Sequence, residues 1–354
     1  LHFKIVFLLS RKNVEKLLQD HPLGLTTEDI FGLFVNFQYD GTHLTCTTGT
    51  SLKTFTLDKT LDHVWDDLIQ KFFKQQKIPY QNHVFHNEYQ PVPPTEKDYI
   101  LHYQNHEVLA NTAKETLSFP TFWDAAKAQP EIYKNYIYLF SIDETRYYLV
   151  PDFQASWTPE FSFADISVFR SFEPKEQAFA LITGFHLFTW YQKHRFCGAC
   201  GHENVHDQKE RMLLCPVCGN TQYPRISPAV IVGVRNGEKL LLSKYAGRNH
   251  TRYALIAGFA EIGETLEETV KREVMEEVGL KVKNIRYYRS QPWALSGSLL
   301  SGFYCDLDGD DQITLDETEL AVAEWFERKA IPYEDYDVSL TREMMLQFKK
   351  GLDA

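Results

Sequence analysis

Three glutamates, Glu273, Glu276 and Glu277, lie close together in the stretch Arg272-Glu273-Val274-Met275-Glu276-Glu277. On a helix, residues three and four positions apart share one face, so these carboxylates would crowd together. Crowded carboxylates repel each other unless a positive charge lies between them, and Mg²⁺ prefers such oxygen ligands. The spacing therefore predicts a divalent cation site on a helix. The plainer alternative is an acidic helix face that only meets solvent.

Glycines frame the acidic stretch on both sides. The segment before it reads Gly258-Phe259-Ala260-Glu261-Ile262-Gly263-Glu264, and Gly279 follows it. Glycine permits sharp turns and the left-handed backbone that ends many helices. We therefore expect a turn before the helix and a C-cap after it. Glu264 is expected to form a salt bridge with Arg272, which would position the carboxylates from outside the cation site.

Four of the six cysteines form two Cys-x-x-Cys pairs that are separated by 14 residues: Cys197, Cys200, Cys215 and Cys218. Zn²⁺ takes four such ligands in a tetrahedron and then has no open position, so the expected zinc is structural. A redox pair is the alternative. The nearby His202 and His206 are expected to be bystanders. This cysteine usage favours a reducing cytoplasm, and the apolar start of the chain is interpreted as a strand rather than a signal peptide.

Bulk composition limits the function classes. The chain has 354 residues, which predicts two or three domains. Its net charge of −11 argues against a general nucleic-acid binder, although a short capped RNA end stays compatible as a substrate. No apolar run approaches the roughly 18 residues of a membrane span. The charges around the cysteine pairs are balanced, so nucleic-acid binding by the predicted ribbon remains only an alternative.

Hydrophobic periodicity and turn residues predict the elements that would position these groups. Helices are expected over 58–77, 173–193 and about 340–351. A hairpin is expected around Asp40-Gly41, a second one around Asn236-Gly237, and a linker over 90–95. Further strands are expected at 5–9, 99–103, 136–142, 147–150, 229–234, 239–243, 286–290 and 299–306. The expected domains are a small α+β module over 1–80 and segments over 95–190, 191–224 and 225–354.

Residues 258–280 resemble the signature of the Nudix hydrolases: Gly, five residues, Glu, seven residues, Arg-Glu, an aliphatic, any residue, Glu-Glu, any residue, Gly, an aliphatic. The preceding cysteine pairs, joined by Tyr223-Pro224-Arg225, resemble the NAD(H) pyrophosphatase branch. That branch also carries Ser-Gln-Pro-Trp-Pro-Phe-Pro-x-Ser-Leu-Met, where residues 290–300 here read Ser-Gln-Pro-Trp-Ala-Leu-Ser-Gly-Ser-Leu-Leu. The departures at Ala294, Leu295, Ser296 and Leu300 leave open how strictly NAD(H) would be selected.

The resemblance implies a fold and an activity. The implied fold is α+β with an α-β-α sandwich, in which a mixed β-sheet lies between helices, preceded by a zinc ribbon and N-terminal α+β domains. The implied activity is metal-dependent hydrolysis of the NADH or NAD⁺ pyrophosphate to nicotinamide mononucleotide and AMP, with NAD-capped RNA as a variant of the same cut. A homodimer is implied as well. The alternatives are a broader dinucleotide pyrophosphatase acting on ADP-ribose or diadenosine polyphosphates, and a non-catalytic nucleotide sensor.

The resemblance also implies site residues. The Mg²⁺ or Mn²⁺ ligands would be Glu273, Glu276, Glu277, Glu319 and the backbone carbonyl of Ala257. Of these, Glu277 is expected nearest the attacking water, with Arg272 in support. Substrate contacts would come from Tyr223, Phe259, Gln291, Pro292, Trp293, Ser298 and Arg170. For Tyr223 and Phe259, ordinary core packing is the alternative.

Overall fold

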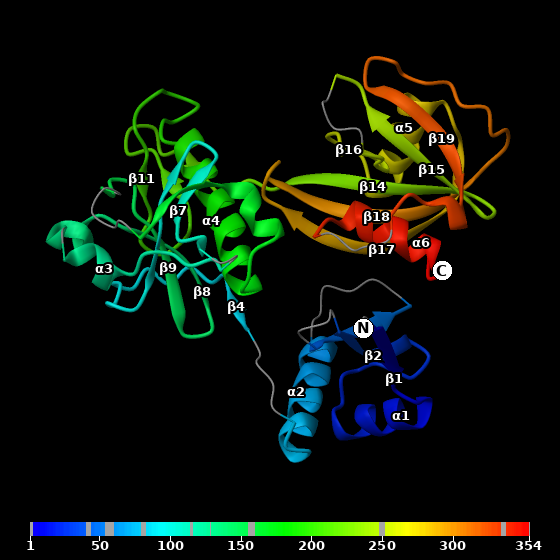
Figure 1. The fold of residues 1–354 in the computed structure, drawn as a ribbon, viewed down its shortest axis with the longest axis horizontal. Helices are drawn as coiled ribbons and strands as arrows, with labels where there is room; N and C mark the ends of the chain where they lie inside the picture. Colours follow the sequence, from blue (N-terminus) through cyan, green and yellow to red (C-terminus); the bar gives the residue numbers. More distant parts are fainter. Residues whose placement is uncertain are drawn as a thin grey trace. The chain divides into compact units, whose positions relative to one another are not determined.

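The computed structural model describes residues 3–39, 44–53, 60–78, 83–113, 116–127, 129–154, 160–247, 252–333 and 338–353. The chain divides into two compact units, Leu1–Asn82 and His83–Ala354 (Figure 1).

The first unit is a three-stranded antiparallel sheet with two helices. Its elements are β1 (Phe3–Leu8), α1 (Arg11–Asp20), β2 (Ile30–Tyr39), β3 (Leu44–Leu52) and α2 (Thr60–Gln75). Buried side chains of α1, β2 and α2 form its core, and the indole N–H of Trp65 donates to the carbonyl of Phe34 at 2.9 Å. The predicted first strand, hairpin and helix are confirmed, whereas α1 was not predicted. The turn at Asp40-Gly41 lies outside the described residues.

The second unit begins with two small sheets. One has the order β4 (Phe85–His86), β8 (Ile137–Ile142), β9 (Thr145–Leu149), β5 (Tyr99–Leu101), and the other β10 (Ser162–Asp165), β7 (Glu107–Ala110), β6 (Tyr103–Gln104). The prediction of one strand over 99–103 was wrong, because the chain passes from one sheet to the other at His102. The buried ring of His102 lies 2.8 Å from the carbonyl of Val150, which holds the crossing point. The segment 90–95, predicted as a linker, has no regular structure but lies inside the second unit rather than between the two units.

Helices surround these two sheets. They are α3 (Phe122–Ala126), the short 3-10 helices η2 (Pro130–Lys134) and η4 (Ile166–Arg170), and α4 (Lys175–Lys193). The prediction of a helix over 173–193 is confirmed, with Pro174 as the residue before its first turn. Most of its apolar side chains are buried, but Phe179 is 40% exposed.

A small ribbon follows, made of β11 (Val205–His206), β12 (Leu213–Leu214) and β13 (Thr221–Gln222). The chain then forms a six-stranded sheet in the order β17 (Val282–Trp293), β18 (Ser298–Leu307), β14 (Ser227–Asn236), β15 (Lys239–Tyr245), β19 (Leu320–Glu327), with β16 (Ile256–Phe259) paired to β14. The predicted hairpin of β14 and β15 is confirmed. The prediction of a strand over 286–290 was too short, and β16 and β19 were not predicted.

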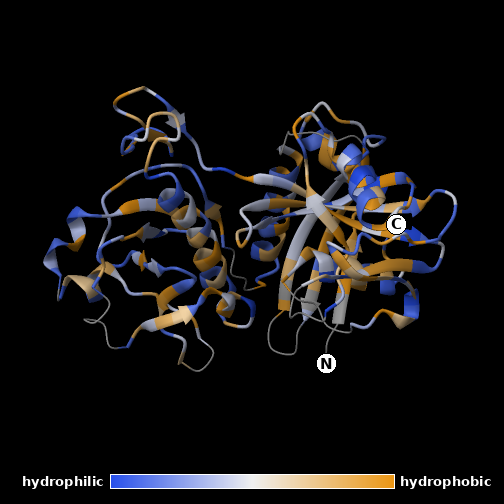
Figure 2. Cartoon of the chain, turned by 90° about the horizontal axis from the view of Figure 1, so that it is seen from above, coloured by the Kyte–Doolittle hydropathy of each residue, from blue (hydrophilic) through white to orange (hydrophobic). Residues whose placement is uncertain are grey.

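Two helices cover opposite faces of the six-stranded sheet. They are α5 (Leu266–Val278) and α6 (Leu340–Lys349), and the short η5 (Arg328–Ala330) precedes α6. Val230 and Val232 of β14 pack with α5, whereas the intervening Ile231 packs with α6. Because alternate residues of a strand face opposite sides, the sheet is sandwiched between the helices, as Figure 1 shows. Apolar residues are concentrated along its strands (Figure 2).

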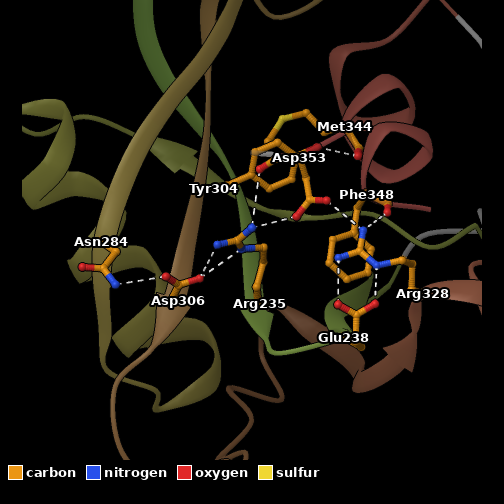
Figure 3. Close-up of polar contacts among 9 residues, drawn as sticks. All are labelled: Arg235, Glu238, Asn284, Tyr304, Asp306, Arg328, Met344, Phe348 and Asp353. Carbon is orange, nitrogen blue, oxygen red and sulfur yellow. Dashed lines mark hydrogen bonds and ion pairs between the residues drawn. The ribbon is translucent and has the colours of Figure 1, made fainter. Parts of the chain in front are cut away.

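An ion-pair cluster fastens the end of α6 to this sheet (Figure 3). The buried carboxylate of Asp353 accepts hydrogen bonds from Arg235 and Arg328, both at 2.7 Å. Arg235 also binds Asp306 of β18, and Arg328 binds Glu238 in the β14–β15 turn. Burial opposes ionisation of Asp353, but the bonds from Arg328 and Arg235 outweigh it and lower the pKa of that carboxyl. The cluster therefore fixes α6 in position on the sheet.

Candidate active site

Helix α5 begins and ends where its sequence dictates. The Thr265 hydroxyl accepts from the backbone N–H of Glu268, whose carboxylate accepts in return from the backbone N–H of Thr265. Gly279 ends the helix at φ 69°, in the left-handed conformation that glycine adopts without strain. Both ends match the expectation from the sequence. The helix buries three valines against the sheet, together with two of the three glutamates.

The three glutamates have different surroundings. Glu273 is 8% exposed and Glu277 only 2%, because both share the helix face that packs towards the sheet. The side chain of Glu276 is 59% exposed and lies at the rim. Among the described residues, no three carboxylates bring their oxygens within 4.8 Å of one another. The carboxylates therefore converge on one side of the sheet without forming a closed cage.

Gly258 of β16 makes room for Glu273. A Cβ atom built on Gly258 would lie 2.0 Å from the carboxyl carbon of Glu273. A side chain at this position would have to displace the carboxylate, which rests directly against the strand backbone. The need for glycine at this position thus comes from close approach rather than from backbone conformation, since its φ is not positive.

Arg272 connects the carboxylates to the loop before the helix. Its guanidinium binds both oxygens of Glu264, at 2.6 and 2.9 Å, which confirms the predicted salt bridge. The same group donates to Glu273 at 2.8 Å, to Glu276 at 2.9 Å and to the carbonyl of Phe259 at 2.9 Å. Hydrogen bonds from Arg272 lower the pKa of Glu264 to about 2, so this pair stays charged. Arg272 therefore sets the positions of Glu273 and Glu276.

We expect Glu264→Gln to lower kcat by about 10- to 100-fold, because residues that hold a metal ligand in place have effects of this size. The guanidinium of Arg272 would lose the carboxylate that binds it at two points. Its position, and with it the position of Glu273, would then be less fixed. The KM should change little, since Glu264 does not line the cleft. Steady-state kinetics with saturating Mg²⁺ measures both constants, and an unchanged kcat would contradict this positioning role.

Glu277 carries the most perturbed carboxyl of the site. Burial, followed by the charges of Glu273 and Glu319, raises its pKa to about 8, against a hydrogen bond from the backbone of Ala257. Its Oε2 atom is buried and has no hydrogen-bond partner among the described residues. Buried polar atoms are almost always paired, so this unpaired carboxyl oxygen suits a cation that replaces its proton. Burial also raises the pKa of Glu273.

Divalent cation affinity should therefore increase with pH. Without metal, Glu277 is protonated below about pH 8, and a cation must displace that proton to bind the carboxylate. We expect affinity for Mg²⁺ to rise by up to about tenfold per unit between pH 6 and pH 8, and then to level off. Calorimetry in buffers of different ionisation enthalpy would detect the released proton. Constant affinity over this range, or proton release that persists in Glu277→Gln, would contradict the assignment.

A cleft of about 800 Å³ lies beside these carboxylates. It brings together groups that are far apart in the sequence, and the sequence-predicted members among its lining residues are Ala257, Phe259, Arg272, Glu273, Glu276, Trp293, Ser298 and Glu319. Ser339 and Thr341, at the start of α6, line it as well and were not predicted. The only sequence signal for them was a serine before an apolar run, which is typical of a helix N-cap.

Trp293 and Ser298 lie at the end of a hairpin. No strand was predicted over 291–298, but β17 continues through Trp293, residues 294–297 turn, and Ser298 begins β18. The guanidinium of Arg170 lies 5.2 Å from the ring of Trp293. The structure thus places the predicted Arg170 next to the predicted Trp293, at the edge of the cleft.

Three other predicted substrate contacts lie elsewhere. The Gln291 amide donates to the carbonyl of Val338 at 2.7 Å and accepts from the N–H of Leu340 at 2.8 Å, so both of its ends serve the start of α6. Pro292 is exposed and pairs with Leu299. Tyr223 is 55% exposed, and its hydroxyl donates to Glu210 of the ribbon at 2.6 Å. None of Gln291, Pro292 and Tyr223 lines the cleft.

The four predicted zinc ligands lie together in the ribbon. Their sulfurs are within 4.8 Å of one another, with Cys197 and Cys218 at 3.6 Å and Cys200 and Cys215 at 3.4 Å. Zinc–sulfur bonds of about 2.3 Å in a tetrahedron place sulfurs roughly 3.8 Å apart, so the cluster fits zinc. Backbone N–H groups of Ala199 and Cys200 lower the pKa of Cys197 to about 6, which favours the thiolate that a metal requires.

The two histidines near the cluster have other contacts. The backbone carbonyl of His202 accepts a hydrogen bond from the N–H of Cys197 at 2.8 Å, and the side chain of His202 is exposed. The ring of His206 lies 5.0 Å from the ring of Tyr191 in α4. Arg211 ties the ribbon to the first sheet of the unit by donating to Asn87 at 2.7 Å and to the carbonyl of Leu139.

Comparison with family models agrees with this geometry. Residues 225–348 match the NUDIX domain, and residues 192–223 match the NADH pyrophosphatase zinc ribbon domain. The chain carries a Nudix domain with this zinc ribbon. Residues 1–81 match a family of unknown function, DUF5721. The predicted Nudix fold, a mixed sheet between helices preceded by a zinc ribbon and N-terminal α+β segments, is confirmed.

Curated relatives share part of the chain. It is 46% identical over 149 residues to the NAD-capped RNA hydrolase NudC of Pectobacterium atrosepticum, and 42% identical over 149 residues to that of Shigella dysenteriae. Each match covers 42% of this chain and 57% or 58% of the relative, so the chain spans less than two thirds of their length. The solved structure of a Nudix hydrolase from Nitrosomonas europaea matches this chain with 25% sequence identity and a TM-score of 0.39. The match covers 45% of this chain and 95% of the hydrolase chain.

Among the helices that the structure describes, none combines the length and the apolar character needed to cross a membrane.

Proposed function

We propose that the Nudix domain hydrolyses the pyrophosphate bond of NADH or NAD⁺ to nicotinamide mononucleotide and AMP, and that NAD-capped RNA is cut at the same bond. The observation that supports this most is the unpaired buried oxygen of Glu277, whose charged neighbours Glu273 and Glu319 line the cleft together with Trp293. The names of the curated relatives support the same substrate class.

Each residue of the cleft has a distinct proposed role. Glu273, Glu277 and Glu319 would hold Mg²⁺ or Mn²⁺, with Glu276 at the exposed rim and the carbonyl of Ala257 as a further ligand. A divalent cation supplies neutralisation of charge on the phosphate oxygens and a lowered pKa for a bound water. Glu277 would lie nearest the attacking water, because its buried Oε2 atom has no other hydrogen-bond partner among the described residues.

Substrate contacts divide between two rings and one helix end. Trp293, backed by Arg170, and the 52% exposed Phe259 offer aromatic faces to a base or a nicotinamide ring. Ser339 and Thr341 at the start of α6 lie where a helix N-terminus favours anionic phosphate oxygens. We propose Tyr223 as a substrate contact only for an assembly of more than one chain in which it lies at a substrate cleft. Gln291 is proposed to position α6 rather than to bind substrate.

The remaining features of the proposal concern the assembly and its surroundings. We propose a homodimer in a reducing cytoplasm, with one structural zinc per chain. The proposed segments are 1–80, 95–190, 191–224 and 225–354. The role of the first segment stays open, because the family that its residues match has no known function.

The direct test is product analysis by mass spectrometry after incubation with NADH, NAD⁺, ADP-ribose and NAD-capped RNA, each with Mg²⁺ or Mn²⁺. The proposal expects nicotinamide mononucleotide and AMP from NADH, and a 5′-monophosphate end from capped RNA. A higher kcat/KM for ADP-ribose than for NADH would favour the broader dinucleotide pyrophosphatase. The departures at Ala294 and Ser296, in the turn beside Trp293, are the observation that keeps this second candidate. Binding without cleavage would support a sensor.

A further inference from the structure

A second groove lies beside the cleft. It has a volume of about 740 Å³, and its walls are the C-terminal half of α4, the β6–β7 turn, the segment that leads into β14 and the hairpin turn at 294–297. Its floor is apolar, with Phe188 and Trp190 buried beneath it. Its accessible rim is polar and includes Asn105, His106 and Gln192.

The groove is positively charged in an acidic chain. None of its lining residues is Asp or Glu, although the chain carries 48 of them and a net charge of −11. Lys193 and Arg225 line it and are both exposed. In the part of the chain that the structure describes, neither cation has a carboxylate within 4 Å, whereas the neighbouring Arg195 pairs with Glu203 at 2.9 Å. Two unneutralised cations in a concave wall attract anions, because a cleft of one charge sign concentrates the field.

The groove continues the cleft. Ser296 lines both, and the hairpin that gives Trp293 and Ser298 to the cleft gives Ala294 and Leu295 to the groove. The ring of His186, on α4, contacts the segment that leads into β14, where its Nε2 atom lies 3.2 Å from the carbonyl of Arg225. A ligand that extends from the cleft past Ser296 therefore enters the groove that Lys193 and Arg225 line.

We propose that this groove binds the single-stranded polynucleotide that is attached to the dinucleotide end of the substrate. The inference rests on the proposed function and extends it, since it assigns a place to the chain beyond the cap. The charges of Lys193 and Arg225 are positive, so they favour the phosphodiester groups of such a chain as ligands. The polar rim can form hydrogen bonds with sugars and base edges without selecting a sequence. Neither Lys193 nor Arg225 lines the cleft, so we expect binding of a free dinucleotide there to depend little on the two cations.

The test compares a short and a long ligand on the full chain with zinc bound. The two ligands are NADH and a fluorescent NAD-capped hexanucleotide, whose binding is followed by anisotropy. Both are measured with the Glu277→Gln variant, so that binding is observed without turnover. Adding Lys193→Gln and Arg225→Gln is expected to weaken hexanucleotide binding by about tenfold or more and NADH binding by less than about twofold. The slope of log affinity against log salt should fall by about 1.4 for the hexanucleotide, at roughly 0.7 per lost phosphate contact.

A matched control is Lys281→Gln with Lys329→Gln, two exposed lysines that line neither the groove nor the cleft. This pair removes the same charge and should leave hexanucleotide binding within about twofold, which separates a local site from a net-charge effect. Equal hexanucleotide affinity before and after the Lys193 and Arg225 changes would overturn the proposal. So would an equal loss for NADH, because the cations would then belong to the dinucleotide site. Neither result bears on whether the wild-type protein cleaves NADH, which product analysis decides separately.

Discussion

Glu277→Gln is expected to lower kcat for NADH by about three orders of magnitude or more, because it removes the anionic oxygen that acts in the transition state. The amide has nearly the same shape as the carboxyl, but it binds a cation weakly and cannot take up a proton. The measurement is the steady-state rate with saturating Mg²⁺ and, separately, with Mn²⁺. A variant with a near-normal rate would refute the assignment of Glu277.

The stability of this variant distinguishes lost chemistry from lost fold. In the metal-free protein the pKa of Glu277 is raised to about 8 from an ordinary value of 4.5. A raised pKa in the folded state stabilises the fold at low pH, and that stability is lost as the pH rises from about 4.5 through about 8. The amide of the replacement side chain does not titrate, so the Glu277→Gln variant has no such loss of stability over this pH range. Metal-free Glu277→Gln should therefore have an equal or higher Tm than the wild type above pH 8.

Glu267→Gln is the matched control. Glu267 lies on the same helix, is exposed and does not line the cleft. The substitution removes one negative charge from α5 in the same chemical way. We expect its kcat to stay within about twofold of the wild type. A comparable loss in Glu267→Gln would show that helix charge, rather than the unpaired oxygen of Glu277, governs the rate.

Cys197→Ser is expected to release the zinc and to unfold the ribbon. Each ribbon strand has only two residues, and the ribbon has few buried apolar side chains besides Leu213, so metal bonds have to supply most of its folding free energy. The cluster would keep three thiolates and one weak hydroxyl ligand. Metal analysis should show a loss of bound zinc, and limited proteolysis should show new cleavage within 195–222.

The catalytic helix should survive this change. The buried core around α5 contains valines of α5 and β14 and no residue of the ribbon. Near-ultraviolet spectra of the Nudix domain should therefore change little. Cys46→Ser is the control, since Cys46 lies in the first unit, outside the sulfur cluster, and its loss should leave the zinc content unchanged. Stoichiometric zinc in Cys197→Ser would refute the four-thiolate site.

The sequence predicted the zinc cluster and the C-cap of α5 because both depend on short-range spacing, whereas the N-cap at Thr265 was not predicted. Each Cys-x-x-Cys turn supplies two sulfurs to the cluster from within four residues, and Gly279 ends the helix through bonds from its N–H to carbonyls of the last turn. The hairpin at Asn236-Gly237 is local for the same reason. Strands β16 and β19 were missed because they are short or weakly patterned, and partners more than 20 residues away along the chain create them.

The sequence by itself determined which residue types stand at the acidic helix, the salt bridge of Glu264 with Arg272, and the four thiolates. Only the tertiary structure decided that Glu273 and Glu277 are buried while Glu276 is exposed, because that depends on which face of α5 packs on the sheet. It also decided that Gln291 holds the start of α6 in place, because its hydrogen-bond partners Val338 and Leu340 lie far along the chain. Spacing sets contacts within one element, whereas burial and long-range contacts follow from how the elements pack.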